Sequence, residues 1–531
     1  MTKKKPPIDP NSDAAADTAK NPRKPQFTPE TLDSTVIAIP LLDKLKEEQE
    51  KLRKDPEHKP ESFPVIIDLN LEFPEGRDKA GKQVINTIEA IIKDYGKDRN
   101  RHEAVNYEKT LYSTQYVFAS LGGDVIRELV KRDSSTGNRP GLGAIFHIWP
   151  DFKIESLINK SIRTVKADAA QTSFSAFGEN IVWAVLDSGI NASHPHFKYY
   201  ENLNLKPPLA HTDFTRLGAA NPDDATAMHD AFGHGTHVAG IIAGALKLTT
   251  EYKKKTGVKE IRANSRQRDE HGEISYNEIK IDAISGMAPK CKLLSLKVLD
   301  EHGGGLASNI IAAIGMIQEL NGHGRRLLIH GVNLSVGYDF EPEWFACGQS
   351  PLCVEVNRLV RSGVVVVVAA GNTGYGVAQS QFRGVISAGM DLTINDPANA
   401  DLAITVGSTH KDMPHVYGVS YFSSKGPTGD GRAKPDLVAP GEKILSCAAG
   451  TRLEEMQSAG HDCDYLELSG TSMAAPHVSG VIAAFLSIRQ EYIGYPEKVK
   501  EIFLSTATDL KRDRYFQGYG LVDLMRAVQS V

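Results

Sequence analysis

Between residues 180 and 410, short and nearly continuous apolar runs alternate with longer stretches in which apolar residues recur at helical spacing. The short runs predict buried strands at Ile181–Leu186, Lys292–Val298, Leu327–Asn333, Val364–Ala370 and Ala403–Val406. The longer stretches predict helices near Thr236–Leu246, Leu306–Leu320, Cys353–Arg361 and, further along, Ser472–Gln490. Continuous apolar strands joined by helices are typical of a parallel sheet with helices on both faces. We therefore expect residues 156–531 to form an α/β domain with a mostly parallel sheet.

Residues 59–155 follow a different pattern. Strands are predicted at Pro64–Leu71, Gln115–Leu121 and Ala144–Trp149, and helices at Lys79–Tyr95 and Asp124–Arg132. The order strand–helix–strand–helix–strand predicts a small ferredoxin-like α/β domain ahead of the larger one.

Residues 1–58 form a third segment. Up to about residue 30 the chain is rich in Pro, Lys, Asp and Ala, which predicts a disordered tail. Leucines among alternating charges at Leu41–Lys54 predict a charged surface helix, for which we favour a solvated position without a partner.

Composition narrows the possible functions. The chain has 531 residues with 61 Lys and Arg against 66 Asp and Glu, so a formal net charge of −5 gives no electrostatic case for binding nucleic acid. The longest apolar run, Val364–Ala370, is too short to span a membrane. The N-terminus shows no signal-peptide pattern, which predicts a cytoplasmic protein, although export without a signal stays open. Five scattered cysteines include one pair, Cys347 and Cys353, close enough for a local disulfide, but reduced thiols are favoured.

Three polar residues stand at junctions between predicted elements, in the order Asp187, His234, Ser472. A serine hydroxyl is a weak nucleophile that needs a histidine to take its proton and a carboxylate to hold that histidine in the right tautomer. Asn372 follows another strand, and its amide together with the Ser472 N–H are candidate donors to an oxyanion. Each residue alone fits a turn or a helix cap, but the set predicts acyl-transfer chemistry.

The motifs VLDSGI, GHGTHVAG, AAGNTG and GTSMAAP around these four residues resemble those of the subtilase family, in the same chain order. The resemblance implies a subtilisin-like serine endopeptidase in which Asp187, His234 and Ser472 are catalytic and Asn372 contributes to the oxyanion hole. It also implies that polypeptide substrates bind as an added strand beside Gly303, Gly304 and Gly305 on one side and Ser335, Val336 and Gly337 on the other. By the same resemblance, residues 59–155 are a prodomain that assists folding and inhibits the enzyme, with self-cleavage between about 150 and 165.

The chain departs from secreted subtilases in a charged insertion at residues 247–283, directly after the His234 helix. We interpret it as a solvated surface excursion, with a docking loop as the alternative. It lacks the pattern of a calcium loop, so we expect no cofactor, although a structural calcium stays open. His234 and His237 are spaced as a metal pair, but no third ligand is apparent and no metal is expected. The acidic residues Asp223, Asp224 and Asp230 are interpreted as a solvated loop, with a calcium site as the alternative.

Two alternatives to an active, self-processing protease stay open. One is a catalytically silent peptide-binding scaffold, against which the four intact chemical groups argue. The other is a regulated intracellular protease in which the 59–155 domain remains bound and the N-terminal helix recruits partners.

Overall fold

The structure, a computed structural model, describes residues 36–55, 60–95, 103–111, 113–136, 143–151, 160–216, 224–249, 252–253, 260–268, 274–340, 346–380 and 384–531. The chain divides into an N-terminal unit, Met1–Glu155, and a C-terminal unit, Ser156–Val531. The predicted tail and the middle of the predicted cleavage segment lie outside the described residues.

The N-terminal unit is built on an antiparallel sheet of four strands in the order β2-β3-β1-β4. The strands are β1 (Ser62–Leu69), β2 (Ala104–Val105), β3 (Tyr116–Gly122) and β4 (Ile145–Pro150), and the helices are α3 (Arg77–Tyr95), α4 (Tyr107–Thr110) and α5 (Gly123–Thr136). With α3 and α5 as crossovers, this is the β-α-β-β-α-β order of the ferredoxin-like motif. The two-residue strand β2 was not predicted, because so short a segment has no alternation to detect.

The charged helix α2 (Ile39–Lys54) differs from its prediction. Leu41 and Leu45 are fully buried and belong to the same core as the sheet and α3. Ala38, just before the helix, donates a backbone hydrogen bond to the Ile148 carbonyl of β4. The helix is therefore part of the N-terminal unit rather than a solvated segment ahead of it, since its few leucines lie on one face.

The C-terminal unit contains a sheet of seven strands in the order β17-β16-β13-β12-β5-β11-β6, with every neighbouring pair parallel. The strands are β5 (Val182–Asp187), β6 (Thr212–Asp213), β11 (Lys292–Lys297), β12 (Gly331–Leu334), β13 (Val365–Ala369), β16 (Ile404–His410) and β17 (Leu437–Glu442). The predicted parallel sheet is thus confirmed. Strand β17 was missed because its sequence, LVAPGE, contains Pro and Gly.

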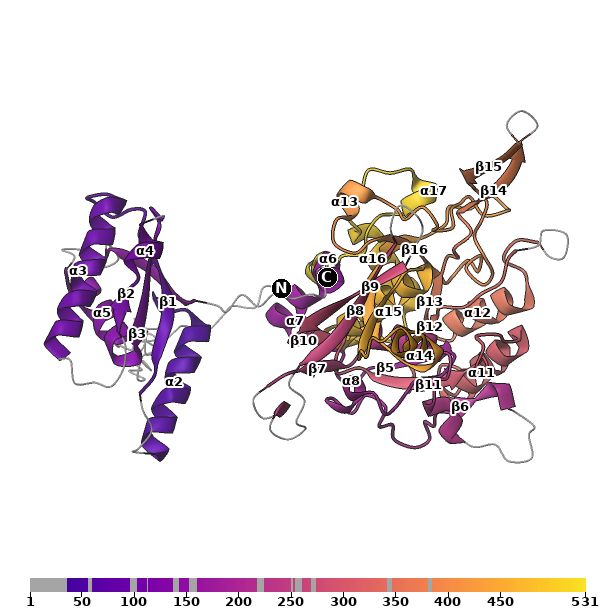
Figure 1. The fold of residues 1–531 in the computed structure, drawn as a ribbon, viewed down its shortest axis with the longest axis horizontal. Coiled ribbons are helices and arrows are strands. Elements are labelled where there is room, and N and C mark those ends of the chain that lie inside the picture. The colour runs from indigo at the N-terminus through magenta and orange to yellow at the C-terminus, as the bar shows by residue number, and fades with distance from the viewer. Residues whose placement is uncertain are drawn as a thin grey trace, which may run out of the picture. The chain divides into compact units, whose positions relative to one another are not determined.

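Helices cover both faces of this sheet, with α9 (His234–Ile242) and α15 (Thr471–Ile488) on one face and α11 (Ala307–Leu320) and α12 (Pro351–Arg361) on the other (Figure 1). Alternate residues of β5 enter two different cores: Trp183 and Val185 lie in the core that includes residues of α9 and α15. Ala184 and Leu186 lie in the core that includes residues of α11 and α12. This two-sided burial explains why the strands are apolar throughout.

Helix α15 is, on length and composition alone, apolar enough to cross a membrane, unlike the short runs considered in the sequence. However, 83% of that stretch is buried inside the protein, as expected for a central core helix.

The described part of the charged insertion contains two paired strands with buried residues, which contradicts its interpretation as a solvated surface excursion. Strands β8 (Ile261–Arg268) and β9 (Ile274–Ile281) are antiparallel, and β8 pairs with β19 (Tyr465–Leu468), which in turn pairs with β18 (Ile444–Cys447). Ile261, Ala263 and Ile281 are buried in the core of the C-terminal unit. The insertion therefore extends a second sheet, because its few apolar residues alternate with charged ones along the strands.

The remaining strands and α-helices lie outside the two main sheets. They are the paired strands β7 (Ala245–Lys247) and β10 (Ala283–Ser285), the hairpin β14 (Tyr375–Ser380) and β15 (Gly384–Gly389), and the helices α6 (Lys160–Thr164), α7 (Ala167–Phe174), α8 (Pro195–Lys198), α13 (Pro414–Tyr417), α14 (Gly450–Ser458), α16 (Pro496–Thr506), α17 (Arg514–Gln517) and α18 (Leu524–Gln529). Of these, α7, α16 and α18 contribute buried residues to the main core. All five cysteines are buried free thiols, so Cys347 and Cys353 form no disulfide.

Candidate active site

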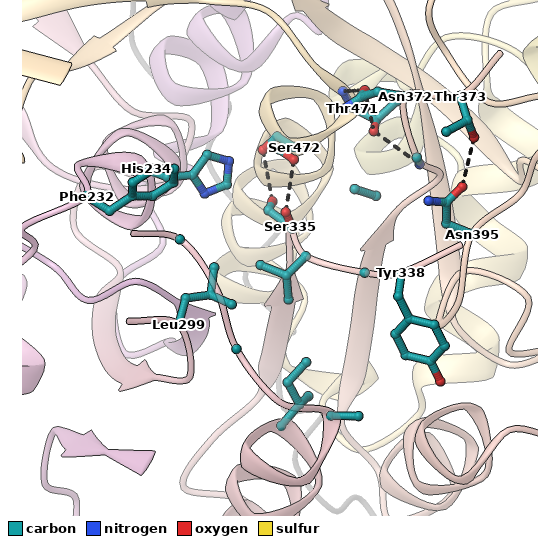
Figure 2. Close-up of a pocket in the computed structure, with 18 of the residues that line it drawn as sticks. Phe232, His234, Leu299, Ser335, Tyr338, Asn372, Thr373, Asn395, Thr471 and Ser472 are labelled. Carbon is teal, nitrogen blue, oxygen red and sulfur yellow. Dashed lines mark hydrogen bonds between the residues drawn. The ribbon is translucent and has the colours of Figure 1, made fainter. Parts of the chain in front are cut away.

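The predicted site residues lie at element ends that meet at one edge of the seven-stranded sheet. Asp187 is the last residue of β5, His234 is the first residue of α9, and Ser472 lies in the first turn of α15. His234, Asn372 and Ser472 line one cleft of about 460 Å³. Figure 2 shows the His234 ring pointing toward Ser472 across this cleft. The convergence follows from parallel strands, whose carboxyl ends share one edge of the sheet.

Asp187 and His234 form a hydrogen-bonded pair behind the cleft. The Nδ1 atom of His234 lies 2.8 Å from Oδ1 of Asp187, which is also the acceptor of the Ser188 N–H at 2.8 Å. The side chain of Asp187 is 1% exposed and that of His234 is 19% exposed. This geometry places the proton of His234 on Nδ1 and leaves Nε2 as an acceptor toward the cleft.

The pKa of His234 reflects competing influences. Burial, the largest, lowers it, but the charge and hydrogen bond of Asp187 and the charge of Asp230 outweigh burial and raise the pKa above 6.5. His234 is therefore mostly protonated at pH 6.5 and becomes a neutral base, able to accept a proton, at higher pH.

Ser472 and Ser335 are joined by two reciprocal hydrogen bonds. The Ser472 hydroxyl donates to the Ser335 carbonyl at 2.9 Å, and the Ser335 hydroxyl donates to the Ser472 carbonyl at 2.9 Å (Figure 2). The second bond is available because Pro476, inside α15, lacks the N–H that would otherwise bind the Ser472 carbonyl. In this structure the nucleophile candidate is therefore oriented toward Ser335 rather than toward His234.

A buried polar chain supports this pair. Asn333 of β12 donates to the Ser335 hydroxyl at 2.9 Å, and Ser479 of α15 donates to the Asn333 side-chain oxygen at 2.9 Å. Asn333 and Ser479 are fully buried. Neither residue was predicted from the sequence, although a lone amide in a buried strand was a visible signal.

The side-chain oxygen of Asn372 accepts two hydrogen bonds from Thr471, from its N–H at 2.8 Å and its hydroxyl at 3.0 Å. The amide is thereby oriented with its NH₂ group available to the cleft. The N–H of Ser472, in the first turn of α15, has no intrahelical acceptor. Gly371 before Asn372 has φ +110°, and a Cβ there would lie 2.5 Å from Asn395, so this sharp turn requires glycine.

The two predicted substrate-binding segments flank the cleft. Gly303 and Gly305 line it on one side, and Ser335, Val336 and Gly337 line it on the other. Gly304 is not among the lining residues, and both of its backbone groups bind Asp300. Apolar side chains of Leu299, Leu306 and Ile310 complete the first side, while Thr373 and Asn395 give the opposite end a polar wall.

Two other predictions concern residues next to the site. Asp230 is 2% exposed and fully hydrogen-bonded, which contradicts its interpretation as part of a solvated loop. Asp223 and the side chain of Asp224 lie outside the described residues. His237 is fully buried and its Nε2 lies 3.1 Å from the Leu466 carbonyl, which agrees with a structural role.

Comparisons with known proteins bear on this arrangement. A model of the subtilase family matches residues 178–521. Pyrolysin of Pyrococcus furiosus is 32% identical over 347 residues, which cover 58% of this chain and 22% of pyrolysin. Subtilisin DY of Bacillus licheniformis is 29% identical over 373 residues, covering 69% of this chain and 97% of that protein. Serine protease AprX of Bacillus subtilis is 29% identical over 354 residues, covering 65% and 64%.

A parallel sheet that presents an Asp–His pair and a serine at its carboxyl edge defines this protein as a serine hydrolase. With the family match across most of its C-terminal unit, the chain belongs to the subtilase family of subtilisin-like serine endopeptidases.

Proposed function

We propose that this chain hydrolyses internal peptide bonds through an acyl-enzyme intermediate, with Ser472 as nucleophile, His234 as base and then acid, and Asp187 as the carboxylate that orients His234. The observation that carries the proposal is the 2.8 Å hydrogen bond between Nδ1 of His234 and the buried Asp187. The His234 ring points toward Ser472 (Figure 2). No cofactor is needed for this chemistry.

The first step is a change of the Ser472 rotamer. Its hydroxyl donates to the Ser335 carbonyl in the structure. A peptide that adds as a strand beside Ser335–Gly337 brings N–H groups that compete for this carbonyl. Once displaced, the hydroxyl turns to Nε2 of His234, which takes its proton as Ser472 attacks the scissile carbonyl.

The tetrahedral intermediate carries a negative oxygen. The Ser472 N–H, at the positive end of α15, and the Asn372 NH₂ group are its proposed donors. Because strand addition recognises main chain, the endopeptidase is expected to accept many sequences.

Covalent labelling tests the proposal directly. A fluorophosphonate probe applied to the full-length protein should modify one residue, and peptide mapping by mass spectrometry should place the adduct on Ser472. Ser335, a serine in the same cleft whose hydroxyl donates to the Ser472 carbonyl, is the internal control. Absence of any adduct on Ser472 in folded protein would contradict the mechanism.

The N-terminal unit is proposed to act as an inhibitory prodomain. Its helices cover one face of the sheet, and the other face carries apolar residues in register, since Ile66 pairs with Phe118 on one side and with Trp149 on the other. Trp149 is 40% exposed. An apolar sheet face with exposed aromatic residues supports docking on another protein surface, here proposed to be the C-terminal unit.

Replacing Phe118 and Trp149 together with serine should therefore raise the activity of intact full-length protein roughly tenfold or more, because the inhibitory contact loses aromatic area. The measurement is hydrolysis of a peptide anilide before any self-cleavage, which mass spectrometry monitors. Leu71→Ser, an exposed apolar residue in the turn after β1, should change nothing. A wild-type chain as active as one that begins at Ser156 would count against inhibition.

A cytoplasmic location stays a prediction. It is compatible with five buried free thiols, of which Cys353 and Cys463 have pKa values raised by burial to about 12 and about 11.

A further inference from the structure

Asp230 is a second buried carboxylate next to the Asp187–His234 pair. Its side chain accepts four hydrogen bonds: from the Ser188 hydroxyl at 2.8 Å, the Gly233 N–H at 2.7 Å, the Thr236 N–H at 2.7 Å and the Thr236 hydroxyl at 2.6 Å. A buried carboxylate requires such complete hydrogen bonding.

These bonds join the two segments that carry the catalytic pair. Gly233 and Thr236 belong to the start of α9, whose first residue is His234. Ser188 directly follows Asp187, and its N–H binds Oδ1 of Asp187 at 2.8 Å. The Ser188 hydroxyl also accepts the Gly235 N–H at 3.0 Å. Asp230 thus caps the histidine helix and holds the aspartate loop through the same carboxylate.

The two segments are packed without space between them. A Cβ at Gly235 would lie 2.2 Å from the Gly189 carbonyl and 3.1 Å from Cβ of Asp187. Because the backbones touch, a small rotation of α9 against the loop changes the alignment of His234 with Asp187. The hydrogen bonds of Asp230 oppose such a rotation.

The charge of Asp230 also reaches the imidazole. Three charged groups act on His234 from the elements around it: Asp187 and Asp230 favour its protonated form, and Arg452 of α14 opposes it. Arg452 lies over the Phe232 ring at 5.4 Å and pairs with Glu455 at 3.7 Å. During catalysis His234 becomes an imidazolium, so a fixed negative charge behind it stabilises the transition state.

We propose that Asp230 is a positioning residue for the catalytic pair, which holds α9 and the Asp187 loop in register and supplies a second buried negative charge behind His234. This inference rests on the proposed function, because it needs His234 to act as the base.

The test compares Asp230→Asn with wild type in the full-length protein, after incubation until activity toward a small peptide anilide is constant. The variant should lower kcat roughly 10- to 100-fold with little change in KM, because alignment and not substrate binding is lost. The acidic limb of its pH–rate profile should move to lower pH, since a negative charge that raises the pKa of His234 is removed.

Asp213→Asn is the matched control. Asp213 is also buried and accepts bonds from Thr215 and Thr226, but it lies in β6. The Asp213→Asn variant should be less stable to heat than wild type, but its pH–rate profile should be unchanged. If Asp230→Asn behaves like this control, Asp230 is merely structural and the proposal is wrong.

Two further outcomes are distinguishable. If Asp230→Asn does not fold, Ser188→Ala, which removes the link between the carboxylates, replaces it: a lower kcat supports the proposal and an unchanged kcat overturns it. If wild-type protein itself takes no fluorophosphonate label on Ser472, the proposed function fails, and this inference fails with it.

Discussion

Replacing Asp187 with asparagine should lower kcat on the order of 10⁴-fold while the fold is retained. The structure shows why the isosteric change is severe. Oδ1 of Asp187 accepts both the His234 Nδ1–H and the Ser188 N–H, whereas the buried Oδ2 has no hydrogen-bond partner among the residues that the structure describes.

An asparagine at position 187 has two orientations, and both are unfavourable. With its NH₂ group toward His234, it also opposes the Ser188 N–H and favours the histidine tautomer that cannot accept a proton from Ser472. With its oxygen toward His234, the NH₂ group takes the buried position of Oδ2, which offers no acceptor. In both, the charge that stabilises the imidazolium is lost.

The measurement is steady-state hydrolysis of a peptide anilide between pH 6 and pH 9, with circular dichroism to verify the fold. Asp213→Asn, a buried aspartate away from His234, controls for the loss of a buried carboxylate. A kcat within tenfold of wild type would remove Asp187 from its proposed role.

In wild type, activity should rise with pH through a midpoint above 6.5, because the pKa of His234 is raised.

The second large effect expected is a loss of stability in mild acid. Four fully or almost fully buried histidines have pKa values lowered from 6.5 by burial: His194 and His477 to about 4, and His196 and His237 to about 3. These histidines stay neutral in the folded protein at pH 5 but become protonated in the unfolded chain. Unfolding is therefore favoured progressively as the pH falls below 6.5.

The size of this effect follows from the shifts. At pH 5 each of the four contributes about 2 kcal/mol against the folded state, so about 8 kcal/mol is lost relative to neutral pH. This sum is comparable to the whole stability of a typical domain. His234 has the opposite sign, because its raised pKa favours the folded state in acid, but it is one group against four.

Urea unfolding of the Ser472→Ala variant at pH 5, 6, 7 and 8 measures this loss without self-digestion. Tryptophan fluorescence, to which the buried Trp183 of the C-terminal unit contributes, follows unfolding. His323→Asn, which removes an exposed histidine of the turn after α11, should leave the pH dependence unchanged. A free energy of unfolding that is flat between pH 7 and pH 5 would show that the buried histidines are not held neutral.

The sequence predicted the large sheet and the residues that gather at its edge, because each of Asp187, His234, Asn372 and Ser472 follows or begins a strongly apolar element. The glycines beside them marked the junctions. These signals come from neighbouring residues, so they can be recognised in a single sequence.

The contacts that hold the site together could not be predicted in this way, because they join residues that are far apart in the sequence. Ser335 binds Ser472 across 137 positions of the chain, and Ser479 binds Asn333 across 146. Asp230 looked like part of an acidic loop because two of its four donors are backbone N–H groups, which nearly every residue type offers, and the other two are the common hydroxyls of Ser188 and Thr236. Helix α2 and the hairpin β8–β9 were underestimated for a related reason: a narrow apolar face among many charges gives a weak pattern, although packing uses it fully.

The pairing of β8 with β19 has an evolutionary consequence. Strand β19 ends four residues before Ser472. The inserted hairpin therefore pairs, through β8, with the strand that leads directly to the nucleophile. The opposite edge of β19 pairs with β18, so the hairpin does not replace that pairing. A protease of this kind can therefore acquire new surface, with new charge and shape, close to its reaction centre without disturbing it.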